Sequence, residues 1–197
     1  MCAVVRRGGT PAKRADAICF GTLAQRSPVS RATIRRAVAA TRETAWRLFD
    51  VNLRLTLYDV DVVTQSLELA NAVKLNEEEL PVVARLCGLA SGSPVEQLRA
   101  LSERFALRLA ALTRGPRGSV LVSGGDVFEC RAPRAKVVDT VGAGDAFSAA
   151  LLVGILAGES MTAVNQRANA IAAYVCSQPG ATPDLHTLRG VRTVVET

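Results

Sequence analysis

The sequence predicts an α/β fold, a parallel sheet with helices on both of its faces. Short apolar runs alternate with longer amphipathic segments along the chain, and no internal repeat or low-complexity tract interrupts the alternation. Alternation of this kind favours a parallel sheet, because each crossover helix packs back onto a face of the sheet. With 197 residues, 49% of them hydrophobic, the chain is long enough for one globular domain with a sizeable core. We expect that domain over residues 15–197.

The first half of the chain contains three predicted strands and two predicted helices. The strands are short apolar runs, two of which end in asparagine: Ala17–Leu23, Arg47–Asn52 and Ala72–Asn76. A helix is predicted from Ser30, a favourable capping residue, to about Trp46, and a shorter one over residues 59–69. In the longer helix, the residues expected to face the core are Ile34, Val38, Ala45 and Trp46.

The second half continues the alternation. Glutamates 77–79 suit the first turn of a helix, because the helix dipole favours acids there. Another helix is expected to begin at Ser93 or Pro94 and to end near Phe105. A strand at Leu107–Leu112 should lead through the turn at residues 113–118 into a hairpin of Ser119–Ser123 and Val127–Arg131. The last two helices are predicted at Ala146–Ala157, ended by Gly158, and at Thr162–Ser177.

The start of the chain and its charge distribution predict few partners. Residues 1–14 carry four basic and no acidic residues and lack the continuous apolar stretch of a secretory signal, so we expect a frayed or non-native start. Residues 1–50 hold ten lysines and arginines against three acids. The arginines alternate with alanines without aromatic stacking platforms, which favours a solvated helix face over nucleic-acid binding. No apolar run is long enough to span a membrane.

The chain has five scattered cysteines and a single histidine. This pattern argues against a zinc site and against a disulfide framework. Reduced thiols in a cytoplasmic protein fit better.

The main chemical motif is the stretch Asp139-Thr-Val-Gly-Ala-Gly-Asp145, which runs directly into an apolar helix. Free backbone N–H groups at a helix start attract anions. The loop is neither a Walker A motif, since no Gly-Lys-Ser/Thr follows, nor a dinucleotide fingerprint, since Phe147 stands where the third glycine belongs. From the residues alone, Asp145 is either a helix cap or a general base aimed at an incoming hydroxyl group.

This stretch, continued by Ala-Phe-Ser-Ala-Ala-Leu-Leu152, resembles the C-terminal signature of the ribokinase/fructokinase (PfkB) family of carbohydrate kinases. The resemblance implies a ribokinase-like sandwich and ATP-dependent phosphoryl transfer to a sugar hydroxyl. It makes Asp145 the catalytic base, in contact with substrate, and gives the backbone of Gly142, Ala143 and Gly144 the role of an anion hole.

Further motifs resemble the family in order along the chain. Asn76-Glu-Glu-Glu79 is similar to its Asn-x-x-Glu motif, which implies Mg²⁺ near Glu79 and nucleotide phosphates near Asn76, although acids at a helix start have the same pattern. Thr113-Arg-Gly115-Pro-Arg-Gly118 is similar to its nucleotide turn, or is a plain tight turn.

Three weaker similarities complete the set. Asp50-Val-Asn-Leu-Arg54 resembles a segment of the fructokinase branch, in which Arg54 would meet substrate, or Arg54 forms a surface ion pair. Asn169, within Ala-Asn-Ala, resembles the family's adenine-pocket segment, or is a polar residue on a half-buried helix. Asp139 together with Gly180-Ala181 resembles a loop for a monovalent cation such as K⁺.

The resemblance runs from about Ala15 to about Pro183 and corresponds to the C-terminal two-thirds of the family pattern. The family's N-terminal strands, its Gly-Gly sugar motif and its lid have no counterpart here. We therefore expect a truncated fructokinase-like kinase, weakly active or inactive as given, with ATP, Mg²⁺ and a sugar as ligands and no nucleic acid or membrane partner. The resemblance also allows a homodimer. The alternative is a non-catalytic remnant that binds a nucleotide or a partner protein.

Overall fold

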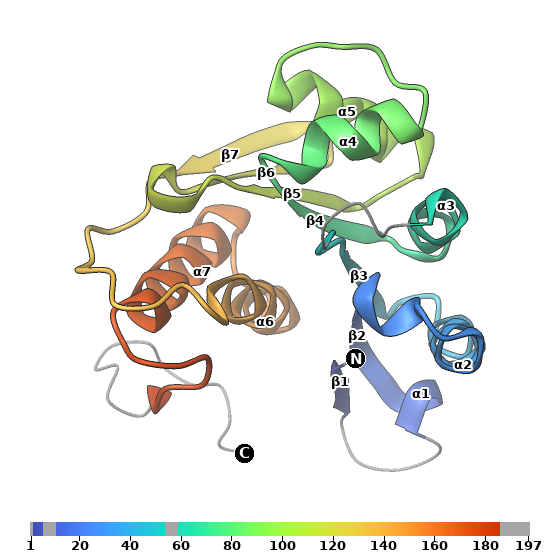
Figure 1. Cartoon of the computed structure of the whole chain (residues 1–197), viewed down its shortest axis with the longest axis horizontal. Coiled ribbons are helices and arrows are strands. Elements are labelled where there is room, and N and C mark those ends of the chain that lie inside the picture. The colour runs from blue at the N-terminus through green and yellow to red at the C-terminus, as the bar shows by residue number, and fades with distance from the viewer. Residues whose placement is uncertain (1, 6–10, 54–58, 186–197) are drawn as a thin grey trace. The chain divides into compact units, whose positions relative to one another are not determined.

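The computed structural model describes residues 2–5, 11–53 and 59–185 (Figure 1). The chain divides into two compact units. Unit 1 comprises the described residues of Met1–Leu112 together with Val122–Val127, and unit 2 comprises those of Thr113–Leu121 and Phe128–Thr197. Among the described residues, no helix is long and apolar enough to cross a membrane.

The strands of the described sheet follow chain order, from β1 to β7. Strands β2, β3 and β4 run parallel, with Phe20 opposite Phe49 and Asp50 opposite Lys74. This confirms the predicted parallel arrangement for the middle of unit 1. The strands of unit 1 are β1 (Cys2–Val5), β2 (Ala15–Gly21), β3 (Trp46–Asp50), β4 (Ala72–Asn76) and most of β5 (Leu109–Thr113).

Two parts of the segment for which a frayed or non-native start is predicted, residues 1–14, have regular secondary structure. Residues 2–5 form β1, which pairs antiparallel with β2 and makes the sheet mixed. Residues 11–14 form a single helical turn, α1 (Pro11–Arg14). The backbone groups along one edge of β2 therefore have partners, which the local composition of residues 1–14 could not predict.

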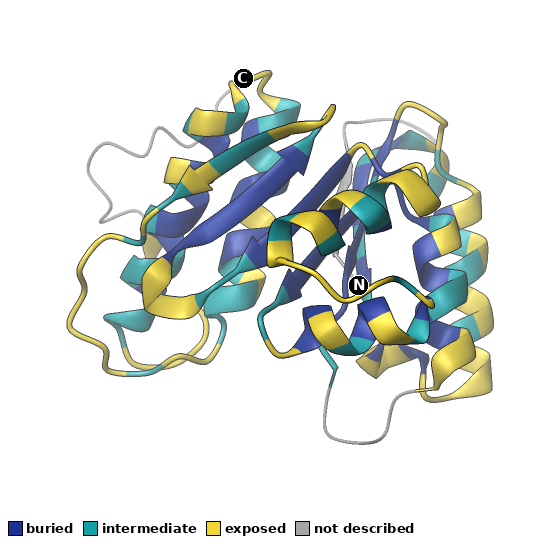
Figure 2. Ribbon diagram, turned by 90° about the horizontal axis from the view of Figure 1, so that it is seen from above, coloured by how far each residue is buried: buried dark blue, intermediate teal, exposed yellow. Residues whose placement is uncertain are grey.

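The helices of unit 1 begin at identifiable capping residues. Asp59 accepts a hydrogen bond from the N–H of Asp61 at the start of α3, and Ser93 forms a capping box with Glu96 at the start of α5. Figure 2 shows the strand interiors as buried and the outer helix faces as exposed. The helices are α2 (Pro28–Ala39), α3 (Val60–Leu69), α4 (Glu79–Leu86) and α5 (Pro94–Arg104), and a 3₁₀ turn, η1, spans Leu23–Gln25.

The prediction of one helix from Ser30 to Trp46 was wrong at both ends. Helix α2 begins at Pro28, because proline is favoured at the first helical position, and it ends at Ala39. Trp46 is instead the first residue of β3. The core assignment was nevertheless correct, since all four predicted residues are buried: Ile34, Val38, Ala45 and Trp46.

Unit 2 contains a tight turn and a helical pair. Helices α6 (Ala143–Leu156) and α7 (Met161–Cys176) lie side by side (Figure 1). A Cβ atom on Gly154 of α6 would lie 3.1 Å from Cγ2 of Val164 on α7, so the glycine permits the close approach. The remaining elements are the 3₁₀ turn η2 (Gly115–Arg117) and strands β6 (Ser119–Ser123) and β7 (Asp126–Cys130), and residues of both strands belong partly to unit 1.

Candidate active site

The Asp139–Asp145 loop is shaped by a glycine at the start of α6. Gly142 is the N-cap residue and has a φ of 82°, a left-handed conformation that side chains other than glycine rarely adopt. A Cβ atom at this position would also collide with the carbonyl group of Ala181. The loop therefore needs glycine here for both its backbone conformation and its contact with the segment that follows α7.

Asp145 lies at the third position of α6 and is exposed. The N-cap residue is Gly142, and no side chain caps this helix, so the interpretation of Asp145 as an N-cap was wrong. Within the part of the chain that the structure describes, the Asp145 carboxylate makes no hydrogen bond or ion pair. Both of its oxygens can therefore accept a proton or a hydrogen bond from a bound molecule.

The backbone N–H groups at the start of α6 lie where the anion site is predicted. The first helical bond runs from the N–H of Ala146 to the carbonyl of Gly142, 2.8 Å away. The N–H groups of Gly142, Gly144 and Asp145 donate to no described residue. The N–H of Ala143, expected to belong to the anion hole, instead makes a 3.3 Å bond to the carbonyl of Thr140. In this conformation Asp145 takes the place of Ala143 as a backbone donor.

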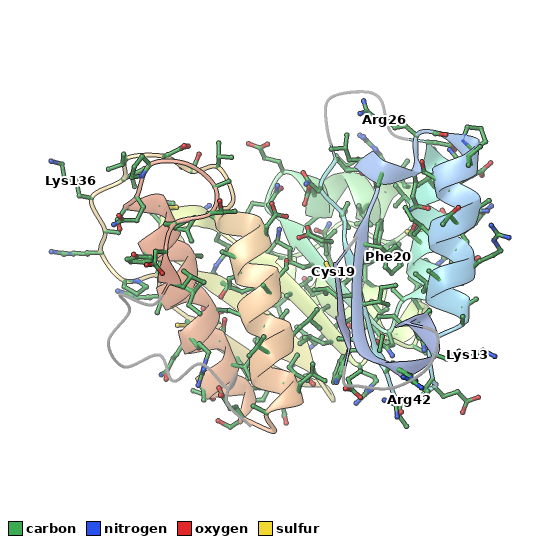
Figure 3. The ribbon with its side chains drawn as sticks, turned by 90° about the horizontal axis from the view of Figure 1, so that it is seen from below. Lys13, Cys19, Phe20, Arg26, Arg42 and Lys136 are labelled. Carbon is green, nitrogen blue, oxygen red and sulfur yellow. The ribbon has the colours of Figure 1, made fainter. Side chains whose placement is uncertain are left out.

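Asp139 connects this loop to the segment after α7. Its Oδ1 accepts from the N–H of Val141 at 2.9 Å, and its Oδ2 accepts from the N–H of Gly180 at 3.3 Å. The N–H of Val138 also donates to the carbonyl of Cys176. The predicted elements of a cation loop, Asp139 and Gly180, are therefore in contact, and its cation remains a prediction. Figure 3 shows Lys136 projecting from the loop just before Asp139.

We expect Gly142→Ala to weaken ATP binding by about tenfold or more, because the added Cβ must displace either the loop or Ala181. The measurement is calorimetric titration of the purified variant with Mg²⁺-ATP. The control is Gly158→Ala, near the other end of α6, where φ is 74° but a Cβ would meet nothing within 4 Å. Both changes strain the backbone, so equal losses of ATP affinity would contradict an anion site at Gly142.

The predicted nucleotide turn at residues 113–118 is closed by its own backbone. The N–H of Arg114 donates to the carbonyl of Gly118 at 2.7 Å, and the N–H of Gly118 donates to the carbonyl of Gly115 at 3.0 Å. Gly118 has a φ of 89°, and a Cβ there would collide with the backbone of Cys130. Glycine at 118 is therefore required by the fold itself, whatever Thr113 and Gly115 bind.

Three buried polar side chains form a network beside the end of this turn; Asn169 was predicted as a site residue, whereas Ser119 and Asn165 were not. Ser119 of β6 and Asn165 of α7 are 0% and 1% exposed, and Asn169 is 5% exposed. The Asn169 Nδ2 group donates to Ser119 Oγ at 2.6 Å and to the carbonyl of Asn165 at 2.8 Å. The network joins α7 to the strand that begins where the predicted nucleotide turn ends.

Unit 1 holds the other predicted group, around the start of α4. The Oδ1 atom of Asn76 accepts hydrogen bonds from the N–H groups of Glu78 and Glu79, both at 2.9 Å. The Glu79 carboxylate in return accepts from the N–H of Asn76 and from that of Leu53, both at 2.8 Å. This is the reciprocal pattern of a capping box. Burial raises the pKa of the Glu79 carboxyl above its ordinary value, although the two N–H donors oppose the rise.

A buried ion pair stands beside this group. Lys74 Nζ lies 3.0 Å from Oδ1 and 3.3 Å from Oδ2 of Asp50, and both side chains are 9% exposed. The parallel register of β3 and β4 places the two residues opposite each other. Asp50 belongs to a predicted motif but has no predicted role, and Lys74 was not predicted as a site residue. Arg54, the predicted substrate contact, lies outside the described residues.

We expect Asn76→Ala to lower the free energy of unfolding by about 1 kcal/mol, because two N–H groups at the start of α4 lose their acceptor. Urea unfolding followed by circular dichroism measures the change. Glu78→Ala is the control, since the Glu78 side chain is exposed and only its backbone N–H takes part in the capping bonds. If Asn76→Ala left stability unchanged, the capping role of Asn76 would be contradicted.

The residues around Glu79 fit a magnesium ion held through water. Mg²⁺ keeps several waters and binds proteins through one or two carboxylates together with substrate phosphates. Glu79 offers one ionisable carboxylate whose position is fixed by two backbone donors. Among residues 2–5, 11–53 and 59–185, no group of three or more acids, histidines or cysteines could enclose a metal ion. Glu79 would hold such an ion through its waters, and the ion remains a prediction.

Comparison with known proteins decides the family. The model of the pfkB family of carbohydrate kinases matches residues 11–188. The chain belongs to this family. The family relationship accounts for the order of the motifs along the chain, and the resemblance inferred from Asp139–Leu152 is confirmed.

Relatives and solved structures agree with the family assignment. A fructokinase of Klebsiella pneumoniae is 35% identical over 134 residues, which are 65% of this chain and 42% of that protein. An uncharacterized sugar kinase of Pyrococcus horikoshii, solved in complex with ATP, is 32% identical with a TM-score of 0.69, over 86% of this chain and 54% of the other.

A fructokinase of Vibrio cholerae, solved with fructose, ADP and calcium ion, is 27% identical with a TM-score of 0.71, over 84% of this chain and 56% of the other. The chain thus spans about half the length of these relatives. The expected ribokinase-like α/β fold is confirmed by these structures.

Proposed function

We propose that this chain carries the phosphate-handling machinery of a fructokinase-like enzyme that transfers the γ-phosphoryl group of ATP to a sugar hydroxyl. The observation that carries the proposal is the exposed, unpaired carboxylate of Asp145 beside backbone N–H groups that lack acceptors. A base and an anion site next to each other suit the attack of a hydroxyl group on a phosphoryl group.

In this mechanism, the Asp145 carboxylate accepts the proton of the sugar hydroxyl as its oxygen attacks the γ-phosphorus. The bond from that phosphorus to the bridging oxygen breaks, and ADP leaves. The N–H groups of Gly144 and Asp145 donate hydrogen bonds to the transferred group as its charge redistributes. Glu79 would hold the waters of a bound Mg²⁺, and that ion would supply positive charge to offset the charge of nucleotide phosphates.

The known ligands of the relatives support the substrates. The Pyrococcus sugar kinase was solved with ATP, and the Vibrio fructokinase with fructose and ADP. An aminoimidazole riboside kinase of Salmonella enterica, 26% identical, was solved with its riboside and an ATP analogue. The acceptor panel for this chain should therefore include both hexoses and ribosides.

The test is transfer of labelled γ-phosphate by the purified chain. With Mg²⁺-ATP and the acceptor panel, we expect saturable ATP binding and slow, acceptor-dependent formation of a labelled sugar phosphate. ATP binding without transfer to any acceptor would instead support the alternative, a non-catalytic nucleotide-binding protein. Absence of ATP binding would overturn both proposals.

A further inference from the structure

Helices α2 and α3 of unit 1 lie side by side (Figure 1) and border an open hollow of about 380 Å³. That volume is within the range of small-molecule sites, about 300–1,000 Å³. Each helix contributes residues three or four positions apart, which share one helical face. The residues that line the hollow are Arg35, Arg36, Ala39, Gln65, Glu68 and Leu69. None of them belongs to the site proposed for phosphoryl transfer.

The wall formed by α2 carries two cations without partners. Arg31, one turn earlier on the same helix, pairs with Asp59 at the start of α3. By contrast, the side chains of Arg35 and Arg36 make no hydrogen bond or ion pair with any described residue. A guanidinium group stays charged at ordinary pH and bonds well to a carboxylate, which it can hold through two parallel hydrogen bonds. This wall therefore suits an anion.

The wall formed by α3 offers acceptors instead. Glu68 is exposed, and its carboxylate pairs with no cation in the described part of the chain. The Oε1 atom of Gln65 is buried and accepts no hydrogen bond. A buried acceptor without a donor is unfavourable, because it has lost water and gained no partner. The last torsion of a glutamine side chain is soft, so this oxygen can turn towards a donor that enters the hollow.

We propose that this hollow binds a zwitterionic amino acid with an apolar side chain. The carboxylate of the ligand bonds with the two guanidinium groups of α2, and its ammonium group donates to the two acceptors of α3. Its side chain contacts Ala39 and Leu69. A plain anion would leave Glu68 facing a like charge, and a plain cation would face the two arginines. The proposal is independent of the proposed kinase function.

The first test compares three ligands that share one carbon skeleton, by nuclear magnetic resonance titration of the purified chain at low ionic strength, where exposed charges are least screened. L-leucine is the probe, isocaproate lacks its ammonium group, and isoamylamine lacks its carboxylate. We expect saturable binding of L-leucine, and binding about tenfold or more weaker for both analogues, since each loses its charge-assisted hydrogen bonds at one wall. Equal affinity of either analogue, or no saturable binding of L-leucine, would overturn the proposal.

The second test assigns the two walls. Arg35→Met and Glu68→Gln should each weaken L-leucine binding by about tenfold, and Glu68→Gln should not weaken the binding of isocaproate. Arg85→Met and Glu103→Gln are the matched controls, because both residues are exposed and neither lines the hollow. Urea unfolding of the same samples shows whether the variants are equally folded. Unchanged L-leucine affinity in both Arg35→Met and Glu68→Gln would contradict a site between α2 and α3.

Discussion

Replacing Lys74 with methionine should lower the free energy of unfolding by about 3–5 kcal/mol. The ammonium group lies 3.0 Å from the Asp50 carboxylate, and both side chains are 9% exposed. Methionine fills most of the space of lysine, so little packing is lost. The cost arises because the Asp50 carboxylate stays buried after its counter-charge is removed, and water cannot compensate there.

A double-mutant cycle in urea unfolding tests this explanation. The double variant Asp50→Asn with Lys74→Met removes both charges. Its free energy of unfolding should fall less than that of Lys74→Met alone. Arg42→Met is the control: Arg42 pairs with Asp16 near the surface, with side chains 54% and 25% exposed, and should cost at most about 1 kcal/mol. Figure 3 labels Arg42. A loss below 1 kcal/mol for Lys74→Met would show that the pair is solvated in solution.

The sequence predicted elements whose limits are set by local chemistry. The strand Ala72–Asn76 was predicted at its observed bounds, because its apolar run ends where Asn76 begins to cap the next helix. The helix expected from Ser93 or Pro94 was found for the same reason, since Ser93 and Glu96 form its capping box. By contrast, α2 ends at Ala39 without a glycine or proline to mark the end, and the prediction ran on to Trp46.

Contacts between distant residues were beyond local patterns. Lys74 sits in an apolar run, and its partner Asp50 is fixed only by the register of β3 on β4. Ser119 and Asn165 are 46 residues apart and meet through the packing of α7 on β6. A serine after a turn and an asparagine on a helix are ordinary features by themselves. Polar residues at buried positions of otherwise apolar elements were the signal that could have revealed both clusters.

The loop before α6 was predicted in outline, and its details depended on backbone geometry. The glycines indicated an anion site, and the structure shows N–H groups without acceptors at that place. Which N–H groups are available follows from the left-handed conformation of Gly142, which turns Ala143 towards Thr140. The same conformation sets Gly142 as the cap and moves Asp145 to the third helical position. A sequence alone does not distinguish these positions.

That placement leads to the prediction with the largest expected effect on activity. Asp145→Asn should reduce phosphoryl transfer by the chain by about 10²- to 10⁴-fold, the usual contribution of a general base. Asparagine keeps the shape of the side chain but cannot take the proton of the attacking hydroxyl. ATP affinity should change little, because the backbone N–H groups at the anion site are retained. Stability should also change little, because Asp145 makes no capping bond that could be lost.

The measurement is single-turnover transfer of labelled γ-phosphate to the acceptor that the unchanged chain uses best, with ATP affinity measured by calorimetry on the same preparations. Asp126→Asn is the matched control, since it neutralises another exposed aspartate, at the start of β7, and should leave transfer unaltered. If Asp145→Asn transferred phosphate within about twofold of the unchanged chain, Asp145 would not be the base. If it lost transfer and ATP affinity in equal measure, the carboxylate would act in binding, and the proton would have to go to another acceptor.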